Sequence, residues 1–322
     1  MTPARRPSTV FFIHRGPLQP YAQAAVLQAR AADSESSIVL LGDQARETVS
    51  PEILGEITYE LLDNYSSRSD AFSKIFRFEG NNGFDYELLN FQRWFCVRSY
   101  CEAHSVAGPL LILDSDAYLY LAVSEVAPLL STSMTVVDKV GPQFTFFLTL
   151  QALTDFTNFL TDSFSTDKGF EQLAKFVRES DDAGVPHVSD MAAFGVYARQ
   201  HKLEDLGDST RKDVVFCENI GSPQGLVMSP MGKKVTKRHG RRYFTTLKGR
   251  EVLAGGVHLQ GGNKDLWPYF VDHTVRAALR RSSPRDSSHA RRTARQKAFR
   301  IGLLKASTRA KNLLTRRLNK KS

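Results

Sequence analysis

The chain has 322 residues, of which 42% are hydrophobic and 21 are phenylalanine, and this apolar content supports a sizeable core and excludes global disorder. No apolar run reaches the ~18 residues that a membrane-spanning helix needs, and the apolar part of the N-terminal stretch is too short for a signal peptide. Three cysteines without a C-x-x-C pair argue against a disulfide framework, so we expect a cytoplasmic protein.

Charge is distributed unevenly along the chain. The net charge is +9, but residues 280–322 hold 15 of the 43 Lys and Arg residues and only one of the 34 acidic residues. The first 279 residues are therefore mildly acidic, with 28 basic residues against 33 acidic ones. We divide the chain into a globular domain over residues 8–275 and a basic tail over residues 280–322, which need separate explanations.

Apolar patterns typical of strands and helices alternate, and this alternation predicts an α/β fold. In chain order we expect strands or helices at the following positions: strand 8–14, helix 21–32, strand 37–42, strand 72–78, helix 85–104, strand 110–114, strand 134–140 and helix 146–160. From 213 to 259 the pattern changes to short β segments broken by Gly and Pro, including a basic β-hairpin over 233–250 that turns at His239-Gly240.

The most apolar predicted strand, 110–114, runs directly into two acidic residues, Asp114 and Asp116. Such a strand is buried on both faces of a sheet, and ligands of open α/β sheets bind at the carboxyl ends of strands. Two carboxylates there repel each other unless positive charge lies between them. Because alternate residues of a strand point the same way, we predict that Asp114 and Asp116 bind one divalent cation, Mn²⁺ or Mg²⁺.

Arg93 lies on an otherwise apolar face of the helix 85–104. A buried guanidinium group needs an anion. Two interpretations remain open: Arg93 pairs with a structural Asp or Glu, or it faces the carboxylates or phosphates gathered at the end of the 110–114 strand.

A second motif, HLQGGNK, follows the apolar run 252–257. His258 at a strand end is a candidate nitrogen ligand for the same metal, Gly261 lets the backbone approach a bound group, and Lys264 offers a point charge for phosphate. The plain alternative is a Gly-Gly turn with an exposed His and Lys, which is common in proteins.

A D-x-D triplet after a buried strand, followed near the end of the domain by H-x-x-G-x-x-K, resembles the GT-A nucleotide-sugar glycosyltransferases. The resemblance is greatest to the family of glycogenin and the bacterial lipopolysaccharide galactosyl- and glucosyltransferases. It implies that Asp114, Asp116 and His258 hold Mn²⁺ and that Gly261 and Lys264 contact the diphosphate of the donor.

The resemblance also implies a Rossmann-like mixed sheet flanked by helices in a single domain. The implied activity is transfer of a sugar from a nucleotide-diphosphate donor, with UDP-sugars favoured, to a glycan, glycolipid or other acceptor, with retention of configuration. In related enzymes an acid at a helix start touches the donor sugar or the reacting centre, and Asp190 best fits that position. Alternatively, Ser189 and Asp190 only cap a helix and complement its dipole.

The sequence of the tail predicts a basic amphipathic helix over 290–318, because its apolar and basic residues would fall on different faces of a helix. Such a helix suits an anionic membrane surface, and similar extensions attach some of the lipopolysaccharide glycosyltransferases to the membrane. A solvated, disordered tail is the alternative.

Two other functions compete with glycosyl transfer. The tail suits nucleic-acid binding, although it holds one aromatic residue, Phe299, and the body shows no nucleic-acid module. A sugar nucleotidyltransferase would carry a Gly-rich loop with Arg and Lys directly after the first strand, and His14-Arg15-Gly16-Pro17 does not supply it.

Truncation after about residue 280 should detach the protein from anionic vesicles and leave turnover of a soluble acceptor almost unchanged. Each basic residue near the surface contributes about 1 kcal/mol, and the apolar stripe adds to that, so added salt should weaken binding only in part. Replacing Phe299 and Leu303 by Ser should remove the salt-resistant part in a vesicle flotation assay. Flotation of the truncated protein, or a preference for duplex DNA over anionic lipid, would contradict the membrane prediction.

Overall fold

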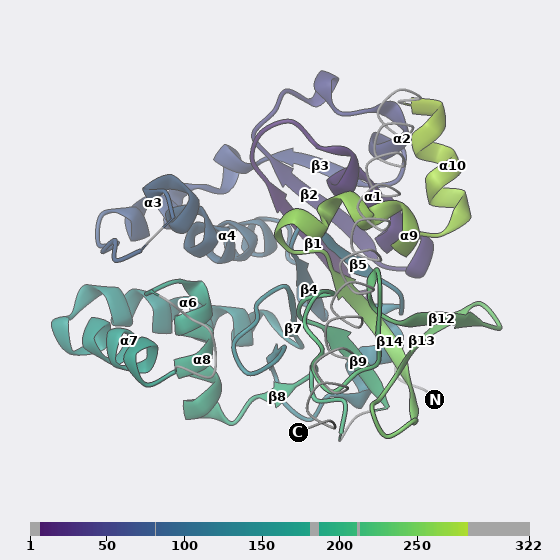
Figure 1. The fold of residues 1–322 in the computed structure, drawn as a ribbon. Coiled ribbons are helices and arrows are strands. Elements are labelled where there is room, and N and C mark those ends of the chain that lie inside the picture. The colour runs from purple at the N-terminus through teal and green to yellow at the C-terminus, as the bar shows by residue number, and fades with distance from the viewer. Residues whose placement is uncertain (1–6, 81, 181–186, 211–212, 283–322) are drawn as a thin grey trace, which may run out of the picture.

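The computed structural model describes residues 7–80, 82–180, 187–210 and 213–282, so the predicted amphipathic tail lies outside the described residues. A five-stranded sheet of order β3-β2-β1-β4-β7 forms the centre of the fold (Figure 1). Its strands are β1 (Thr9–His14), β2 (Ser37–Gly42), β3 (Thr58–Leu61), β4 (Leu110–Leu113) and β7 (Phe144–Phe147). The first four are parallel, and β7 joins β4 antiparallel, so the sheet is mixed.

A second sheet adjoins the first and has the order β12-β13-β14-β5, with β9 paired to β14. Its strands are β5 (Ala117–Leu119), β9 (Val214–Cys217), β12 (Val235–Arg238), β13 (Arg241–Thr245) and β14 (Glu251–His258). Two small two-stranded sheets pair β6 (Thr135–Val136) with β8 (Glu204–Asp205) and β10 (Met228–Ser229) with β11 (Gly232–Lys233). Because β5 starts shortly after β4 ends, residues 114–116 join the two main sheets.

Helices cover both faces of the central sheet (Figure 1). On one side lie α1 (Pro20–Ala32) and α10 (His273–Ser282). On the other lie α4 (Phe84–Ala103), α6 (Leu150–Ser165), α7 (Asp167–Glu179) and α8 (Asp190–His201). The shorter helices are α2 (Pro51–Leu54), α3 (Ser67–Ser73), α5 (Val123–Val126) and α9 (Trp267–Phe270), and the 3-10 turns are η1 (Arg46–Thr48), η2 (Leu62–Tyr65), η3 (Ala127–Leu129) and η5 (Gly261–Leu266).

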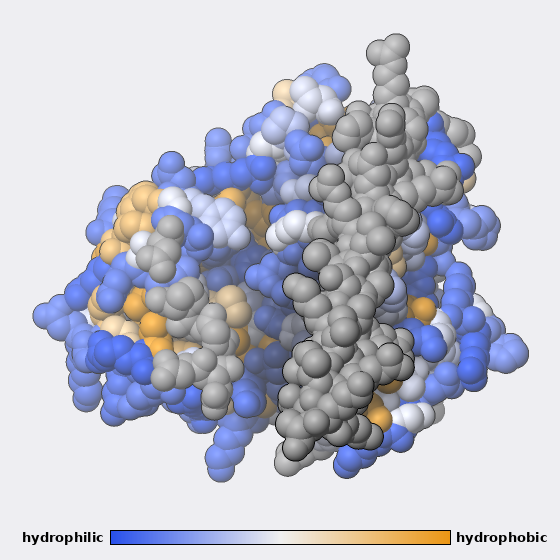
Figure 2. Space-filling model, in the orientation of Figure 1, coloured by the Kyte–Doolittle hydropathy of each residue, from blue (hydrophilic) through white to orange (hydrophobic). Residues whose placement is uncertain are grey.

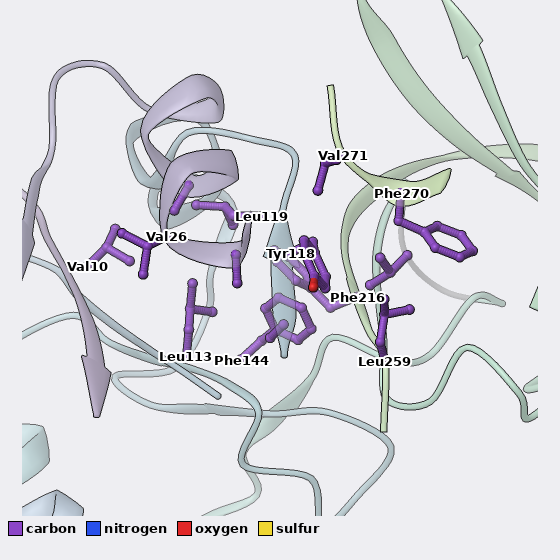
Figure 3. Close-up of a cluster of buried hydrophobic side chains, with 14 of the residues drawn as sticks. Val10, Val26, Leu113, Tyr118, Leu119, Phe144, Phe216, Leu259, Phe270 and Val271 are labelled. Carbon is purple, nitrogen blue, oxygen red and sulfur yellow. The ribbon is translucent and has the colours of Figure 1, made fainter. Parts of the chain in front are cut away.

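Alternation along the central strands divides the apolar core into two clusters. Val10 and Leu113 point to the α1 side, where Figure 3 shows them in a cluster with Tyr118. Phe11 and Ile112 point to the opposite side, toward α4 and α6. Both faces of β1 and β4 are therefore buried, which explains why these strands read as continuous apolar runs. The predicted α/β fold, with a mixed sheet flanked by helices in the GT-A manner, is confirmed.

The strand predicted over 72–78 is wrong. Its first residues belong to α3, and the third strand of the sheet is β3 instead. Phe72 and Phe76 have ring centroids 6.0 Å apart, and the Phe72 ring also stacks on Phe95 of α4 at 4.7 Å. Phe72 lies within α3 and Phe76 lies just beyond its end, and both rings pack on α4.

Two further boundaries differ from the sequence predictions. The strand predicted over 134–140 shrinks to β6, because Asp138 and Lys139 adopt positive φ angles of 51° and 71° in a turn. The helix predicted over 146–160 begins later, since residues 144–147 form β7, and the Thr149 side chain caps α6 by accepting from Ala152 N at 3.2 Å. The basic hairpin is confirmed: β12 and β13 turn at His239-Gly240, both at positive φ.

The surface in the view of Figure 2 is mostly hydrophilic. Apolar colour gathers at the left of this view, over the α3 region and below it over α6 and α7. Phe78 and Phe84 are among the exposed large apolar side chains. Among the described residues, no helix combines the length and apolar character needed to cross a membrane.

Candidate metal centre

The junction between the two sheets places Asp114 and Asp116 beside the end of β14. After β4 the chain makes a tight turn in which Ala117 N donates to Asp114 O at 3.0 Å. The antiparallel pairing of β5 with β14 then sets Ala117 opposite His258. Leu259 N closes the arrangement by donating to Asp116 O at 3.0 Å. The register of the second sheet therefore brings His258 to the D-x-D triplet, although 142 positions of chain separate it from Asp116.

Two carboxylates and one imidazole converge at this point. His258 Nε2 lies 3.1 Å from Asp116 Oδ1 and 3.8 Å from Asp114 Oδ2. One ligand atom from each of the three residues falls within 4.8 Å of the others. Asp116 and His258 are buried, and Asp114 is half-buried, so the three side chains form a largely buried group at the junction of the sheets, which we call the recess. The D-x-D does not act as one continuous strand, as the sequence suggested, since the turn itself directs both acids to one place.

The chemistry of this donor set fits a divalent metal ion. His258 Nδ1 hydrogen-bonds to the Glu218 carbonyl, so in the neutral imidazole Nδ1 carries the proton and Nε2 presents a lone pair toward the carboxylates. An outer hydrogen bond of this kind fixes the tautomer and orientation of metal-bound histidines. Carboxylate oxygens are the preferred ligands of Mn²⁺ and Mg²⁺, and three protein ligands leave positions for a substrate.

Asp116 and His258 stabilise each other's charged forms. Burial alone would raise the pKa of Asp116, but His258 and Lys264 lower it to about 2. Burial likewise acts to lower the pKa of His258, but Asp116 and Asp114 raise it to about 9. The imidazolium form of His258 therefore balances the carboxylates at neutral pH, and a metal ion would have to displace its proton.

Lys264 and Gly261 lie on the 3-10 turn η5, directly beyond β14. Lys264 Nζ lies 3.1 Å from Asp116 Oδ2 and 4.9 Å from the centre of the Tyr21 ring. Burial opposes its charge, but Asp116 raises the pKa of Lys264, so its ammonium group stays charged. Gly261 has a φ of +59°, a conformation that favours glycine, and the space where a Cβ would lie is open.

Arg93 connects Asp114 to Asp190 from the other side of the recess. Its Nη1 donates to Asp114 Oδ1 and its Nη2 to Asp190 Oδ2 at 2.6 Å, while the guanidinium group lies 4.6 Å from the Trp94 ring centre. Burial opposes the charge, but both acids raise the pKa of Arg93. Arg93 fits both interpretations of the sequence: it pairs with a buried acid, Asp190, and it also faces the carboxylates at the end of β4.

Asp190 is the first residue of α8 and is buried against Arg93. Ser189 occupies the N-cap position, but within the described structure its side chain makes no capping hydrogen bond. Burial raises the pKa of Asp190 to about 6, although the bond to Arg93 acts to lower it and favours the carboxylate form. A capping hydrogen bond from Ser189 therefore does not explain these two residues, and the Arg93 contact joins Asp190 to Asp114.

Sequence reasoning missed two contributors to the recess. His14, the last residue of β1, places Nδ1 3.2 Å from Ser115 Oγ, inside the D-x-D triplet. Its position at the carboxyl end of a strand that neighbours β4 was the signal that could have found it. The Glu218 carbonyl that orients His258 is a backbone group after β9, and its role depends only on the pairing of β9 with β14.

No family model and no curated protein matches this sequence. Among solved structures, the chain is similar to mouse xyloside xylosyltransferase 1 in its apo form, with 12% identity, a TM-score of 0.44, and coverage of 66% of this chain and 88% of that chain. It is also similar to the galactosyltransferase LgtC in complex with donor and acceptor sugar analogs, at 13% identity and a TM-score of 0.32, covering 58% and 69%. A third similarity is to the bifunctional glycosyltransferase WbbM, at 11% identity and a TM-score of 0.42, covering 88% and 51%.

These solved structures are glycosyltransferases, and the Asp114–Asp116 pair fits a D-x-D motif.

The pKa of His258 predicts how the stability of the metal-free protein depends on pH. Because the folded-state pKa of about 9 lies above the ordinary value of 6.5, the imidazolium contribution is fully present below pH 6.5 and is lost as the pH rises through 9. We expect wild type to lose on the order of 3 kcal/mol of unfolding free energy relative to His258→Gln across this window. Urea unfolding in EDTA at several pH values measures the difference.

Parallel pH profiles for the two proteins would contradict this charge assignment. Arg238→Gln serves as the control, since it removes an exposed charge from the same sheet. Its profile should stay parallel to wild type over the whole window.

Proposed function

We propose that the protein is a metal-dependent glycosyltransferase that moves a sugar from a nucleotide-diphosphate donor, with UDP-sugars favoured, to a glycan, glycolipid or other acceptor. The proposal rests chiefly on one observation: Asp114, Asp116 and His258 converge at the carboxyl end of the central sheet with Lys264 in contact. Strand ends of this kind are where open α/β sheets bind their ligands. Hard anionic ligands beside a partly exposed ammonium group suit a metal–diphosphate pair.

The metal centre would hold Mn²⁺ or Mg²⁺ through Asp114, Asp116 and His258, and the ion would supply positive charge against the departing diphosphate. Lys264 would add its ammonium group to the same negative charge, because η5 carries it to within 3.1 Å of Asp116. Gly261 would let a phosphate approach the backbone at the start of η5, where no side chain intervenes. Charge stabilisation of the leaving group is the main contribution that these residues offer.

Asp190 would act next to the donor sugar as the catalytic carboxylate of the site. It is buried and is fixed by Arg93, which holds Asp114 with its other nitrogen. A fixed carboxylate can accept a hydrogen bond from a sugar hydroxyl or stabilise positive charge that develops on a sugar ring. Arg93 thus serves as a positioning residue between the metal ligands and the sugar.

A panel of nucleotide sugars, incubated with Mn²⁺ and without acceptor, tests the proposed activity through slow release of the nucleotide. We expect hydrolysis of one UDP-sugar, abolished by EDTA and restored by Mn²⁺. A parallel panel of nucleoside triphosphates with sugar 1-phosphates tests nucleotidyl transfer. Release of pyrophosphate in the second panel alone would replace the proposed function by the competing one.

Asp116→Ala and His258→Ala should each lower metal-dependent donor turnover by at least about 100-fold. Both residues contribute a ligand atom that no neighbouring side chain in the recess duplicates, so the loss should appear in kcat and in Mn²⁺ affinity together. Asp213→Asn provides the control, because Asp213 is an acid of the same sheet region whose side chain is 98% exposed. Full activity in both alanine variants would disprove the metal assignment.

Arg93→Lys should lower kcat by at least about tenfold, because an ammonium group cannot bond Asp114 and Asp190 at once in the geometry of the guanidinium fork. Arg93→Ala should also lower the unfolding free energy by about 3 kcal/mol, since two acids lose their partner. Urea unfolding and donor kinetics on the same preparations separate the two effects. Loss of stability with unchanged kcat and donor KM would reduce Arg93 to a structural ion pair.

A further inference from the structure

A second cavity, of about 500 Å³, lies between the β12–β13 hairpin and the helices α9 and α10. Tyr120, Arg242 and Phe270 form part of its wall, and Lys234 and Tyr269 are exposed at its mouth. None of its described lining residues belongs to the metal centre. In Figure 1 the hairpin extends to the right, below α9 and α10.

Arg242 and Asp272 form the base of this cavity. The Arg242 side chain is buried and donates to the Phe270 carbonyl at 2.6 Å and to Asp272 Oδ1 at 3.1 Å. Its guanidinium group lies 4.0 Å from the centre of the Tyr120 ring. The same Asp272 oxygen also accepts from Lys237 Nζ at 2.6 Å. One carboxylate is therefore shared by two cations, which leaves an excess positive charge.

Two further cations face the cavity without a carboxylate of their own among the described contacts. Lys234 projects from the chain just before β12 and is exposed. Arg276, on the first turn of α10, donates to the Pro268 carbonyl at 3.2 Å, and this neutral partner leaves its charge uncompensated. Lys233 also lines the cavity, but its ammonium group bonds inside the protein to the Asn219 carbonyl and the Gln224 side chain. Leaving Lys233 aside, four cationic side chains face a single carboxylate.

The positive charge of this cavity contrasts with residues 1–279 as a whole, which carry more acidic than basic residues. Such a site focuses its potential on an anion, and an excess of three charges matches a phosphate monoester or a diphosphate better than a carboxylate. The rings of Tyr120, Tyr269 and Phe270 give the remaining wall an apolar character that suits the organic part of a ligand.

We propose that this cavity binds a phosphate group carried by an organic molecule, at a site separate from the metal centre. The chain itself does not offer a complementary occupant in the segment that follows, because residues 283–322 contain 13 Lys and Arg residues and one acid. An external anion fits the charge, and the source is either a soluble phosphate ester or the headgroup of a phospholipid.

Isothermal titration of the full chain with inorganic pyrophosphate, in EDTA to remove metals, tests the site. Lys234→Gln should weaken binding about fivefold, and Lys234→Gln combined with Arg276→Gln should weaken it about 30-fold. Lys248→Gln is the matched control: Lys248 is exposed in the turn between β13 and β14 and does not line the cavity. It should leave the affinity unchanged.

Lys264→Ala distinguishes the cavity from the metal centre, where pyrophosphate has a second possible site. Loss of binding in Lys264→Ala with none in Lys234→Gln would overturn the proposal, as would equal weakening in Lys234→Gln and Lys248→Gln. Absence of binding to wild type would overturn it as well. Lys234→Gln alone changes only an exposed side chain, so it remains a valid test if the double variant unfolds.

Vesicles identify the source of the phosphate. Phosphatidic acid carries a phosphate monoester, whereas phosphatidylglycerol of equal charge density carries a diester. A preference for phosphatidic acid that disappears in the Lys234→Gln/Arg276→Gln variant assigns the cavity to a lipid headgroup. Pyrophosphate binding without that preference assigns it to a soluble ester.

Discussion

Repulsion between Asp114 and Asp116 is the constraint on which the site depends. Two carboxylates at the end of a buried strand are stable there only if positive charge reaches both, because charge is costly to remove from water. The chain meets this need from three separate segments: Arg93 from α4, His258 from the end of β14, and Lys264 from η5. With Asp190 included, three acids face three cations in the metal-free protein.

The architecture of the two sheets follows from bringing these segments together. β4 must be buried on both faces to carry the acids into the recess, which is why α1 and α4 pack on opposite sides of it. The chain then leaves the first sheet within three residues and pairs β5 with β14, so that His258 lies opposite Ala117. Glycine at position 256 allows β14 to lie this close to β5 and β7, because a Cβ there would lie 2.5 Å from the Phe144 ring and 2.9 Å from the Tyr118 carbonyl. The junction of the sheets and the site are thus one feature of the fold.

The sequence motifs were enough to predict the two acids together with His258 and Lys264, but not the contact between Arg93 and Asp190. The apolar run of β4 and the D-x-D that ends it are contiguous, and β1, β2 and α4 follow clear periodic patterns. Asp190 lies 97 positions from Arg93, so only the packing of α8 beside α4 could show the contact. The mistaken strand over 72–78 has the same origin, because aromatic residues that pack on α4 do not reveal from sequence alone whether their period is two or four.

The cations that line the basic cavity could not be grouped from the sequence. Lys234 and Arg242 belong to the predicted basic hairpin over 233–250, and Arg276 belongs to α10, which follows the HLQGGNK motif. No spacing pattern connects them, since the hairpin twist and the packing of α10 decide which cations face inward. Charge counting along the chain also hides the site, because the surrounding domain is acidic overall.

Arg93 connects the proposed metal ligands to the proposed catalytic carboxylate. Its two nitrogens bond Asp114 and Asp190, so one rigid guanidinium plane holds both acids. In the proposed mechanism a divalent ion bound by Asp114, Asp116 and His258 would displace the His258 proton, so one positive charge would be lost while the ion added two. The recess would then be more positive by one charge, and its attraction for the diphosphate of a donor would be stronger. Arg93 would keep Asp190 in place, because its bond to Asp190 does not depend on the ion.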